Sequence, residues 1–138
     1  SLTMLTTYSE SLYQGNDQKR FRTNVAALIN DLRRSGAEKS KKALERLEYL
    51  YIESLNGEKT VNFELVGMKT KEFLGDHSKS EYADRVKYLR GVALVNSSDE
   101  QQGKKLLEEL VNAAEAPEYL KGLARSELSS LVLKNKTL

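Results

Sequence analysis

The sequence predicts an all-α protein of about seven antiparallel helices, stacked as consecutive helix-turn-helix repeats. Apolar residues recur at steps of three and four positions in seven segments, which is the pattern of a helix with one buried face. Leu, Ala, Glu and Lys dominate the composition and favour helix, whereas the alternation typical of strands is almost absent. The segments are separated by short turns, so successive helices should be antiparallel neighbours.

The first three helices are predicted over residues 2–14, 17–34 and 38–55. In the second of them, Phe21 and Val25 begin an apolar stripe that continues at helical spacing to the end of the segment. The stretches QGND before this helix and NGEK after the third helix are typical of turns. These three segments therefore have both the periodicity and the punctuation of separate helices.

Four further helices are predicted over residues 60–74, 79–96, 98–114 and 117–134. On the first of them, Met68 and Phe73 belong to the expected apolar stripe. The last helix begins with Pro117, at a position where the missing proline N–H costs nothing. It has no partner after it and is expected to cap the array.

Three Ser-x-x-Glu patterns predict helix starts, because the serine hydroxyl can accept an orphan backbone N–H while the glutamate reaches back. The pairs are Ser35 with Glu38, Ser78 with Glu81, and Ser97 with Glu100.

The predicted helices also repeat at a regular interval. Alternate helices begin near residues 3, 38, 79 and 117, which are about 35, 41 and 38 residues apart. Intervals of this length are typical of arrays in which each helical hairpin buries its apolar face on the next hairpin.

A family resemblance lies between residues 79 and 134. Gly91 directly follows the letters YLR on the first helix of one hairpin, and Gly103 lies twelve residues later on the second helix. Ala124 repeats the small site of Gly91 after 33 residues. Larger apolar residues and a proline complete the pattern: Leu107, Leu110 and Pro117. This stretch resembles a tetratricopeptide repeat (TPR), which implies a right-handed superhelix with a C-terminal capping helix. A different α–α bundle or solenoid is the alternative.

Length and charge suit one domain over residues 1–138. The 22 basic and 20 acidic residues nearly balance, so nothing strongly favours nucleic acid or a membrane surface. No apolar run has the length of a transmembrane span. We expect the segment to derive from a longer protein, in the cytoplasm or, with a membrane-anchored parent, in the periplasm.

Catalytic and metal-binding patterns are weak. His77 is the single histidine and there is no cysteine, so the common zinc ligand sets cannot be assembled. Asp76, His77 and Ser78 are adjacent in the sequence, whereas the members of a catalytic triad meet through the fold. We therefore expect no enzyme activity, no cofactor and no metal site; an accessory domain of a larger enzyme remains an alternative.

The resemblance implies a concave face lined by the first helix of each hairpin. Tyrosines on such a face make good anchors for a peptide, and cations there can pair with a carboxylate or an acidic segment. The candidate partner-binding residues are Arg46, Tyr49, Lys87, Tyr88, Arg90, Lys121 and Arg125, and Lys42 offers a further cation on these helices.

The resulting expectation is a non-catalytic interaction or scaffold module that binds a peptide or partner domain, and the resemblance implies bacterial envelope assembly as its setting. One alternative is nucleic-acid binding by a basic N-terminal region formed by Lys19, Arg20, Arg22, Arg33, Arg34, Lys39, Lys41 and Lys42. Another is a homo-oligomer formed through the C-terminal helix, using Leu131, Leu133 and Leu138.

Overall fold

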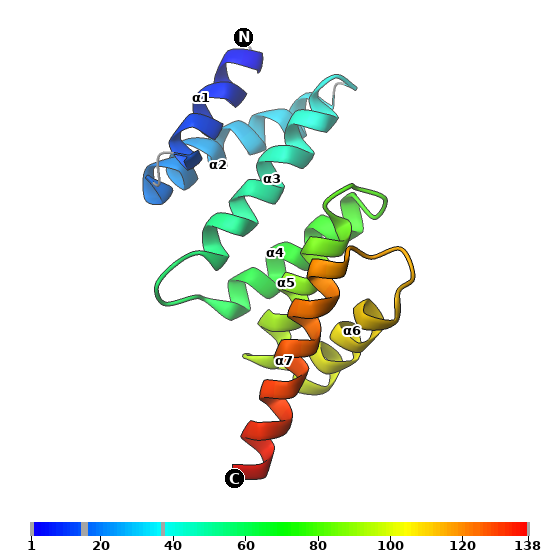
Figure 1. The fold of residues 1–138 in the computed structure, drawn as a ribbon. Helices are drawn as coiled ribbons and strands as arrows, with labels where there is room; N and C mark the ends of the chain where they lie inside the picture. Colours follow the sequence, from blue (N-terminus) through cyan, green and yellow to red (C-terminus); the bar gives the residue numbers. More distant parts are fainter. Residues whose placement is uncertain (1, 15–16, 37, 138) are drawn as a thin grey trace. The chain divides into compact units, whose positions relative to one another are not determined.

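A computed structural model describes the backbone of residues 2–14, 17–36 and 38–137. Within these ranges the chain forms seven α-helices and no strand, which confirms the all-α prediction (Figure 1). Successive helices pack on one another from α1 to α3 and from α4 to α7. The helices are α1 (Leu2–Gln14), α2 (Gln18–Ser35), α3 (Ser40–Asn56), α4 (Phe63–Asp76), α5 (Ala83–Val95), α6 (Glu100–Asn112) and α7 (Glu118–Thr137).

The three predicted capping boxes are wrong. The N-cap of α6 is Asp99, whose carboxylate accepts the N–H of Gln102 at 2.9 Å. The Ser97 hydroxyl instead donates to the carbonyl of Ala93, in the preceding helix. The Ser35 hydroxyl likewise donates backwards, to the carbonyl of Leu32. The side-chain caps at α2 and α4 are Asp17 and Asn62. Short carboxylate and amide side chains therefore start these helices.

The chain divides into two compact units, Ser1–Val61 and Asn62–Leu138. The expectation of one domain over residues 1–138 concerns how these units combine, and it stays a prediction.

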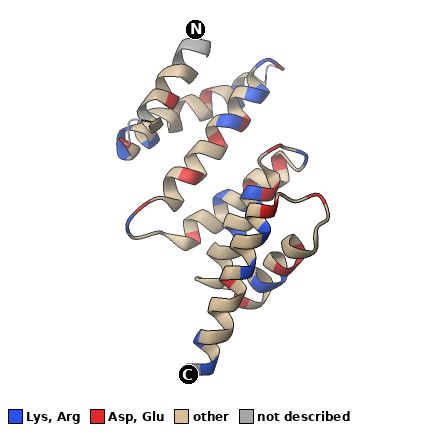
Figure 2. Ribbon diagram, in the orientation of Figure 1, with Lys and Arg blue, Asp and Glu red and all other residues tan. Residues whose placement is uncertain are grey.

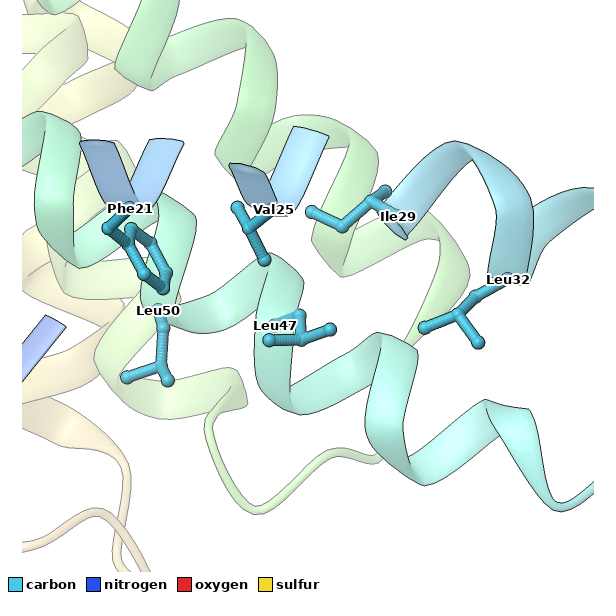
Figure 3. Close-up of a cluster of buried hydrophobic side chains, with 6 residues drawn as sticks. All are labelled: Phe21, Val25, Ile29, Leu32, Leu47 and Leu50. Atoms are coloured by element: carbon cyan, nitrogen blue, oxygen red, sulfur yellow. The ribbon is translucent and has the colours of Figure 1, made fainter. Parts of the chain in front are cut away.

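The first unit consists of α1, α2 and α3, and its core lies between α2 and α3. Figure 3 shows six buried side chains that meet there: Phe21, Val25, Ile29, Leu32, Leu47 and Leu50. The α2 residues follow at helical spacing, so one stripe of that helix is removed from water. Each fully buried side chain of this size contributes about 1.5–3 kcal/mol. The α2 stripe predicted from the sequence is therefore what holds this unit together.

The second unit consists of α4 to α7, and each of these helices packs on the next. Its buried core draws on all four: Val66, Phe73, Val86, Leu89, Ala93, Leu107, Leu110, Leu120, Ala124 and Leu131. Phe73 is buried as predicted, but Met68 is 51% exposed and does not belong to the core. The α4 stripe was therefore wrong at Met68, which lies on the outer surface of this helix.

Helices α5 and α6 cross at two glycines. A Cβ atom on Gly103 would lie 2.7 Å from the carbonyl oxygen of Gly91, and one on Gly91 would lie 2.8 Å from the Leu107 side chain. Both distances are shorter than real Cβ contacts, and at Gly103 the close atoms include main-chain atoms, so glycine at this position allows the two backbones to approach this closely. The close approach of α5 to α6 therefore depends on small residues at positions 91 and 103.

Candidate partner-binding groove

The seven candidate residues are divided between the two units, and those of the first unit already have partners within it. On α3, Arg46 donates from Nε to Glu10 of α1 at 2.7 Å. Tyr49 donates its hydroxyl to the carboxylate of Glu53, one turn along the same helix. The Arg46 contact joins α3 to α1, and the Tyr49 contact lies within α3. Each contact occupies the polar end of the candidate side chain.

Two candidates in the second unit are packed rather than exposed. Tyr88 on α5 is 9% exposed, and the Arg85 guanidinium lies 5.5 Å from the centre of its ring. Burial raises the pKa of Tyr88, and the charge of Glu127 raises it further, whereas Arg85 opposes the shift. Lys121 on α7 is also mostly buried, with its ammonium 3.6 Å from Glu118. Both residues therefore serve the packing of α5 and α7.

Lys87 and Arg125 remain accessible. Lys87 lies 3.9 Å from Asp84 and borders a pocket of about 230 Å³ against the second half of α6. Arg125 is exposed on α7, and it forms no ion pair with any residue that the structure describes.

Arg90 occupies a different environment. Its Nη1 donates to the carbonyl oxygen of Gly67 on α4 at 2.8 Å. Partial burial removes water from the guanidinium and lowers the pKa of Arg90, because a desolvated charge is less stable. No carboxylate within the described ranges pairs with it. Arg90 is thus a partly dehydrated cation whose only polar partner here is a neutral carbonyl.

This guanidinium opens onto a groove of about 540 Å³ between α4, α5 and the start of α6. Volumes of this size are typical of sites that hold small ligands or short segments. The groove is lined by Glu64, Gly67, Met68 and Lys71 of α4, Arg90 and Leu94 of α5, and Ser97, Ser98, Asp99 and Gln102 of the following turn and α6. Cations, acids and apolar side chains therefore all border one hollow.

Local sequence explains why these elements converge. Asn62 starts α4 by accepting the N–H of Leu65 at 3.1 Å, and Asp99 starts α6 in the same way. The buried hydroxyl of Thr70 donates to the carbonyls of Val66 and Gly67, so α4 keeps a polar residue inside without an unsatisfied group. The Gly91–Gly103 crossing then holds the start of α6 against the end of α5.

Of the predicted site residues, only Arg90 lies in this groove, and the α4 wall was missed. Lys71 lies 19 positions before Arg90, and nothing in the spacing of the sequence links the two. The exposed side chain of Met68 beside Gly67 marks this wall in the structure, because a large flexible apolar side chain is unusual on an exposed helix face. The sequence pattern instead placed Met68 in the buried stripe. Recognising the wall required the orientation of α4.

Half of the eight basic N-terminal residues form ion pairs. Arg22, Arg33, Arg34 and Lys41 form ion pairs with Glu58, Glu48, Asp31 and Glu38, respectively. Figure 2 shows acidic residues interspersed with basic ones along these helices. Their combined positive field is therefore weaker than the sequence implies.

His77 is the C-cap residue of α4, and the centre of its ring lies 4.8 Å from the centre of the Phe73 ring. Within the ranges given above, no group of three or more His, Asp or Glu residues is placed to hold a metal ion. None of the helices seen there is long and apolar enough to cross a membrane.

The fold and the groove define a class, an all-α protein of consecutively packed helices with an open, mixed-polarity groove. No protein-family model, curated protein or solved structure matches this chain.

Proposed function

We propose that this chain is a non-catalytic protein-interaction module of the TPR-like kind, and that residues 62–138 hold a peptide or partner domain. The observation that supports it most is Arg90, a partly dehydrated cation at the wall of an open groove that forms no ion pair with any residue in the described ranges. A partly buried cation becomes more stable when a negative group approaches it. Binding of another protein is the simplest way to supply such a group.

The packing of alternate helices supports the repeat part of the proposal. Helix α1 contacts α3 as well as α2, and α5 contacts α7 as well as α6. Contact between alternate helices is expected where hairpins stack in a row. The close crossing at Gly91 and Gly103 agrees with the small residues on which the TPR resemblance depends.

Nucleic-acid binding by the N-terminal region is the weaker candidate. Such a surface needs several converging cations that are free to meet phosphates. Four of the eight candidate cations instead form ion pairs within the first unit. We also propose a place in bacterial envelope assembly, and its support is the family resemblance alone.

The proposal is tested by capture from a lysate of the source organism after nuclease treatment, followed by direct binding of the purified partner to the purified chain. Hydrogen exchange of the complex would then map the contact. Protection confined to residues 62–138, with a defined stoichiometry, supports the proposal. Loss of all captured material on nuclease treatment, or protection of α2 with a steep salt dependence, would favour nucleic acid.

Self-association through α7 is a secondary proposal. Leu133 is 65% exposed and Val132 is 50% exposed, so this helix presents apolar surface to water. Leu131 is instead buried in the unit and is not available for an oligomer contact; this part of the expectation was wrong. Leu138 lies outside the described residues. Sedimentation at increasing concentration would detect a dimer, and Leu133→Ser should weaken it.

A further inference from the structure

We propose that Asn56, the last residue of α3, is a site of spontaneous covalent modification. The main-chain nitrogen of Gly57 converts its side chain to aspartate and isoaspartate, and contacts from Arg22 control how fast this happens. The inference goes beyond the proposed function and does not depend on it, because it concerns the first unit alone, Ser1–Val61.

The pair Asn56–Gly57 has the residue types that this chemistry needs. Asn56 is the only asparagine in the chain that a glycine follows. The side-chain carbonyl of an asparagine is attacked by the nitrogen of the next residue, and any side chain on that residue hinders the approach. A Cβ atom built on Gly57 would meet only the carbonyl oxygens of Glu53 and Ser54 within 4 Å. Among the described residues, no side chain therefore crowds Gly57.

The reaction closes a ring and then opens it with water. A C–N bond forms between the Gly57 nitrogen, which gives up its proton, and the side-chain carbonyl carbon of Asn56. The bond from that carbon to Nδ2 breaks and ammonia leaves, so a cyclic succinimide remains. Water that opens the ring at the former side-chain carbonyl gives aspartate, and water at the main-chain carbonyl gives isoaspartate. In sum, an amide and water become a carboxylate and ammonium, so no oxidant is required.

The side-chain amide of Asn56 is available for this reaction. It is half-buried and forms no hydrogen bond with any residue in the described ranges, and residues 57–60 after it are exposed to the water that opens the ring. Asn96 provides a contrast at the end of α5. Its Nδ2 donates to the Val92 carbonyl at 2.8 Å, and Ser97 follows it. A held amide with a bulkier neighbour should react more slowly.

The folded end of α3 opposes the ring closure. The N–H of Gly57 donates to the Glu53 carbonyl at 3.0 Å, and the N–H of Glu58 donates to the Leu55 carbonyl at 3.4 Å. These bonds hold the Gly57 nitrogen in helical geometry, so the last turn must open before this nitrogen can reach the side chain of Asn56. Local opening of a helix end needs less free energy than global unfolding. The folded protein therefore reacts at a rate set by that opening.

Arg22 of α2 stabilises the closed turn from outside the helix. Its Nη1 donates to the Ser54 carbonyl at 3.1 Å and to the Ser54 hydroxyl at 2.6 Å, and its Nη2 pairs with Glu58. The last carbonyls of a helix lack partners within it, and a cation there complements the helix dipole. Arg22 thus binds the chain on both sides of the Asn56–Gly57 pair. Opening of this turn requires that these contacts loosen.

The products differ from asparagine in charge and in backbone length. A carboxylate at position 56 lowers the formal net charge of +2 by one unit. It also places a negative group at the negative end of the α3 dipole, beside Glu58. Isoaspartate in addition routes the main chain through Cβ, within the stretch that Arg22 spans. Charge and retention time therefore both report the reaction.

The test incubates the full chain for several weeks in neutral buffer, either folded or in concentrated urea. Trypsin then releases peptide 47–59, which contains Asn56, and peptide 91–104, which contains Asn96. Mass spectrometry should detect conversion of amide to acid in peptide 47–59 as two chromatographic species. Isoaspartyl methyltransferase should label only the isoaspartate species. The reaction should be slower in the folded chain than in urea, slower in peptide 91–104, and suppressed by Asn56→Gln.

Variants test the role of Arg22. Arg22→Met should accelerate the reaction in the folded chain about fivefold or more, the factor expected when hydrogen bonds to buried groups are lost. Arg34→Met is the matched control, since its pair with Asp31 is exposed and lies within α2, and it should leave the rate unchanged. If Arg22→Met does not fold, Glu58→Gln removes only the ion pair and should accelerate the reaction about two- to fivefold.

Three results would overturn the inference. Absence of acid in peptide 47–59 from the folded chain would show that the turn stays closed. Equal rates in the folded chain and in urea would show that the helix end gives no protection. An unchanged rate in Arg22→Met, or in Glu58→Gln where Arg22→Met does not fold, would remove Arg22 from the account. Since none of these measurements involves binding to residues 62–138, the proposed function is judged separately.

Discussion

Gly103 faces the backbone of Gly91 so closely that a Cβ atom on Gly103 would lie 2.7 Å from the Gly91 carbonyl oxygen and 2.7 Å from the amide nitrogen of Val95. Both obstacles are main-chain atoms of α5, which cannot rotate away as a side chain can. The Gly91 site is different, because a Cβ there would meet the end of the Leu107 side chain. The α5–α6 crossing is therefore more sensitive at Gly103 than at Gly91.

Gly103→Ala should lower the free energy of unfolding by about 2–3 kcal/mol, because overpacking forces the two backbones apart. Gly91→Ala should cost less than Gly103→Ala. Urea denaturation of the full chain measures both. Gly122 provides the control, since nothing lies within 4 Å of a Cβ built there, and Gly122→Ala should stabilise α7 by about 0.5–1 kcal/mol. Equal effects at all three sites would contradict the close crossing.

Asp99→Ala should destabilise the chain by about 1 kcal/mol, because the N–H of Gln102 loses its acceptor at the start of α6. Ser97→Ala tests the cap that the sequence suggested. The Ser97 hydroxyl donates to Ala93 instead, so its loss should cost less than that of Asp99. Thermal melting followed by circular dichroism can rank the two variants, and the reverse order would restore Ser97 as the cap.

Arg22→Met should destabilise the first unit by about 1–2 kcal/mol. Arg22 donates from Nη1 to the hydroxyl of Ser54 at 2.6 Å and to its carbonyl at 3.1 Å, and it pairs with Glu58. Ser54 is buried, so removing the donor leaves buried acceptors without a partner.

Arg34→Met is the matched control for Arg22→Met. Its pair with Asp31 is exposed and lies within one helix, and such pairs contribute about 0.5 kcal/mol or less. The measurement is hydrogen exchange of α2 and α3 amides in both variants. Similar acceleration in the two would show that the Arg22 contacts do not matter more than a surface pair.

Tyr88 makes stability depend on alkaline pH. Burial raises its pKa above the ordinary 10.0, with a further contribution from Glu127. The folded protein then retains a proton that the unfolded chain releases, so the Tyr88 contribution is complete below pH 10 and is lost as the pH rises through the folded-state pKa. Tyr88→Phe should therefore gain stability relative to the natural chain above pH 10.

Chemical denaturation between pH 8 and about 11 measures the difference between Tyr88→Phe and the natural chain. Below pH 10 the difference should be constant. The exposed Tyr119 on α7 offers Tyr119→Phe as a control for the loss of a hydroxyl. A difference that stays flat across the whole range would show that Tyr88 does not titrate differently in the folded state.

Helix positions could be predicted because each stripe is a local property of the chain. The second predicted helix, 17–34, appears as Gln18–Ser35, and its stripe from Phe21 to Leu32 is the core of the first unit. Helix starts were less predictable, since Ser97 and Asp99 compete for the same N–H groups within three residues. The sequence pattern does not show which of the two residues adopts the backbone angles of an N-cap.

The groove was only partly predictable for a related reason. Arg90 could be proposed because it is a cation on the predicted first helix of a hairpin. The tyrosine and lysine beside it on the supposed binding face, Tyr88 and Lys121, are buried instead. Which face of α5 meets α4 depends on how whole helices pack, and Lys71 joins Arg90 only through that packing.

The hydrogen bond from Arg90 to the Gly67 carbonyl limits how descendants of this sequence can diverge. A lysine at position 90 would have to direct all its donors from one nitrogen, so it could not reproduce the planar fork that the guanidinium presents beside Gly67. The exposed side chains of Met68 and Lys71 on α4 are under no such constraint. Substitutions should therefore accumulate along α4 while the arginine on α5 stays unchanged.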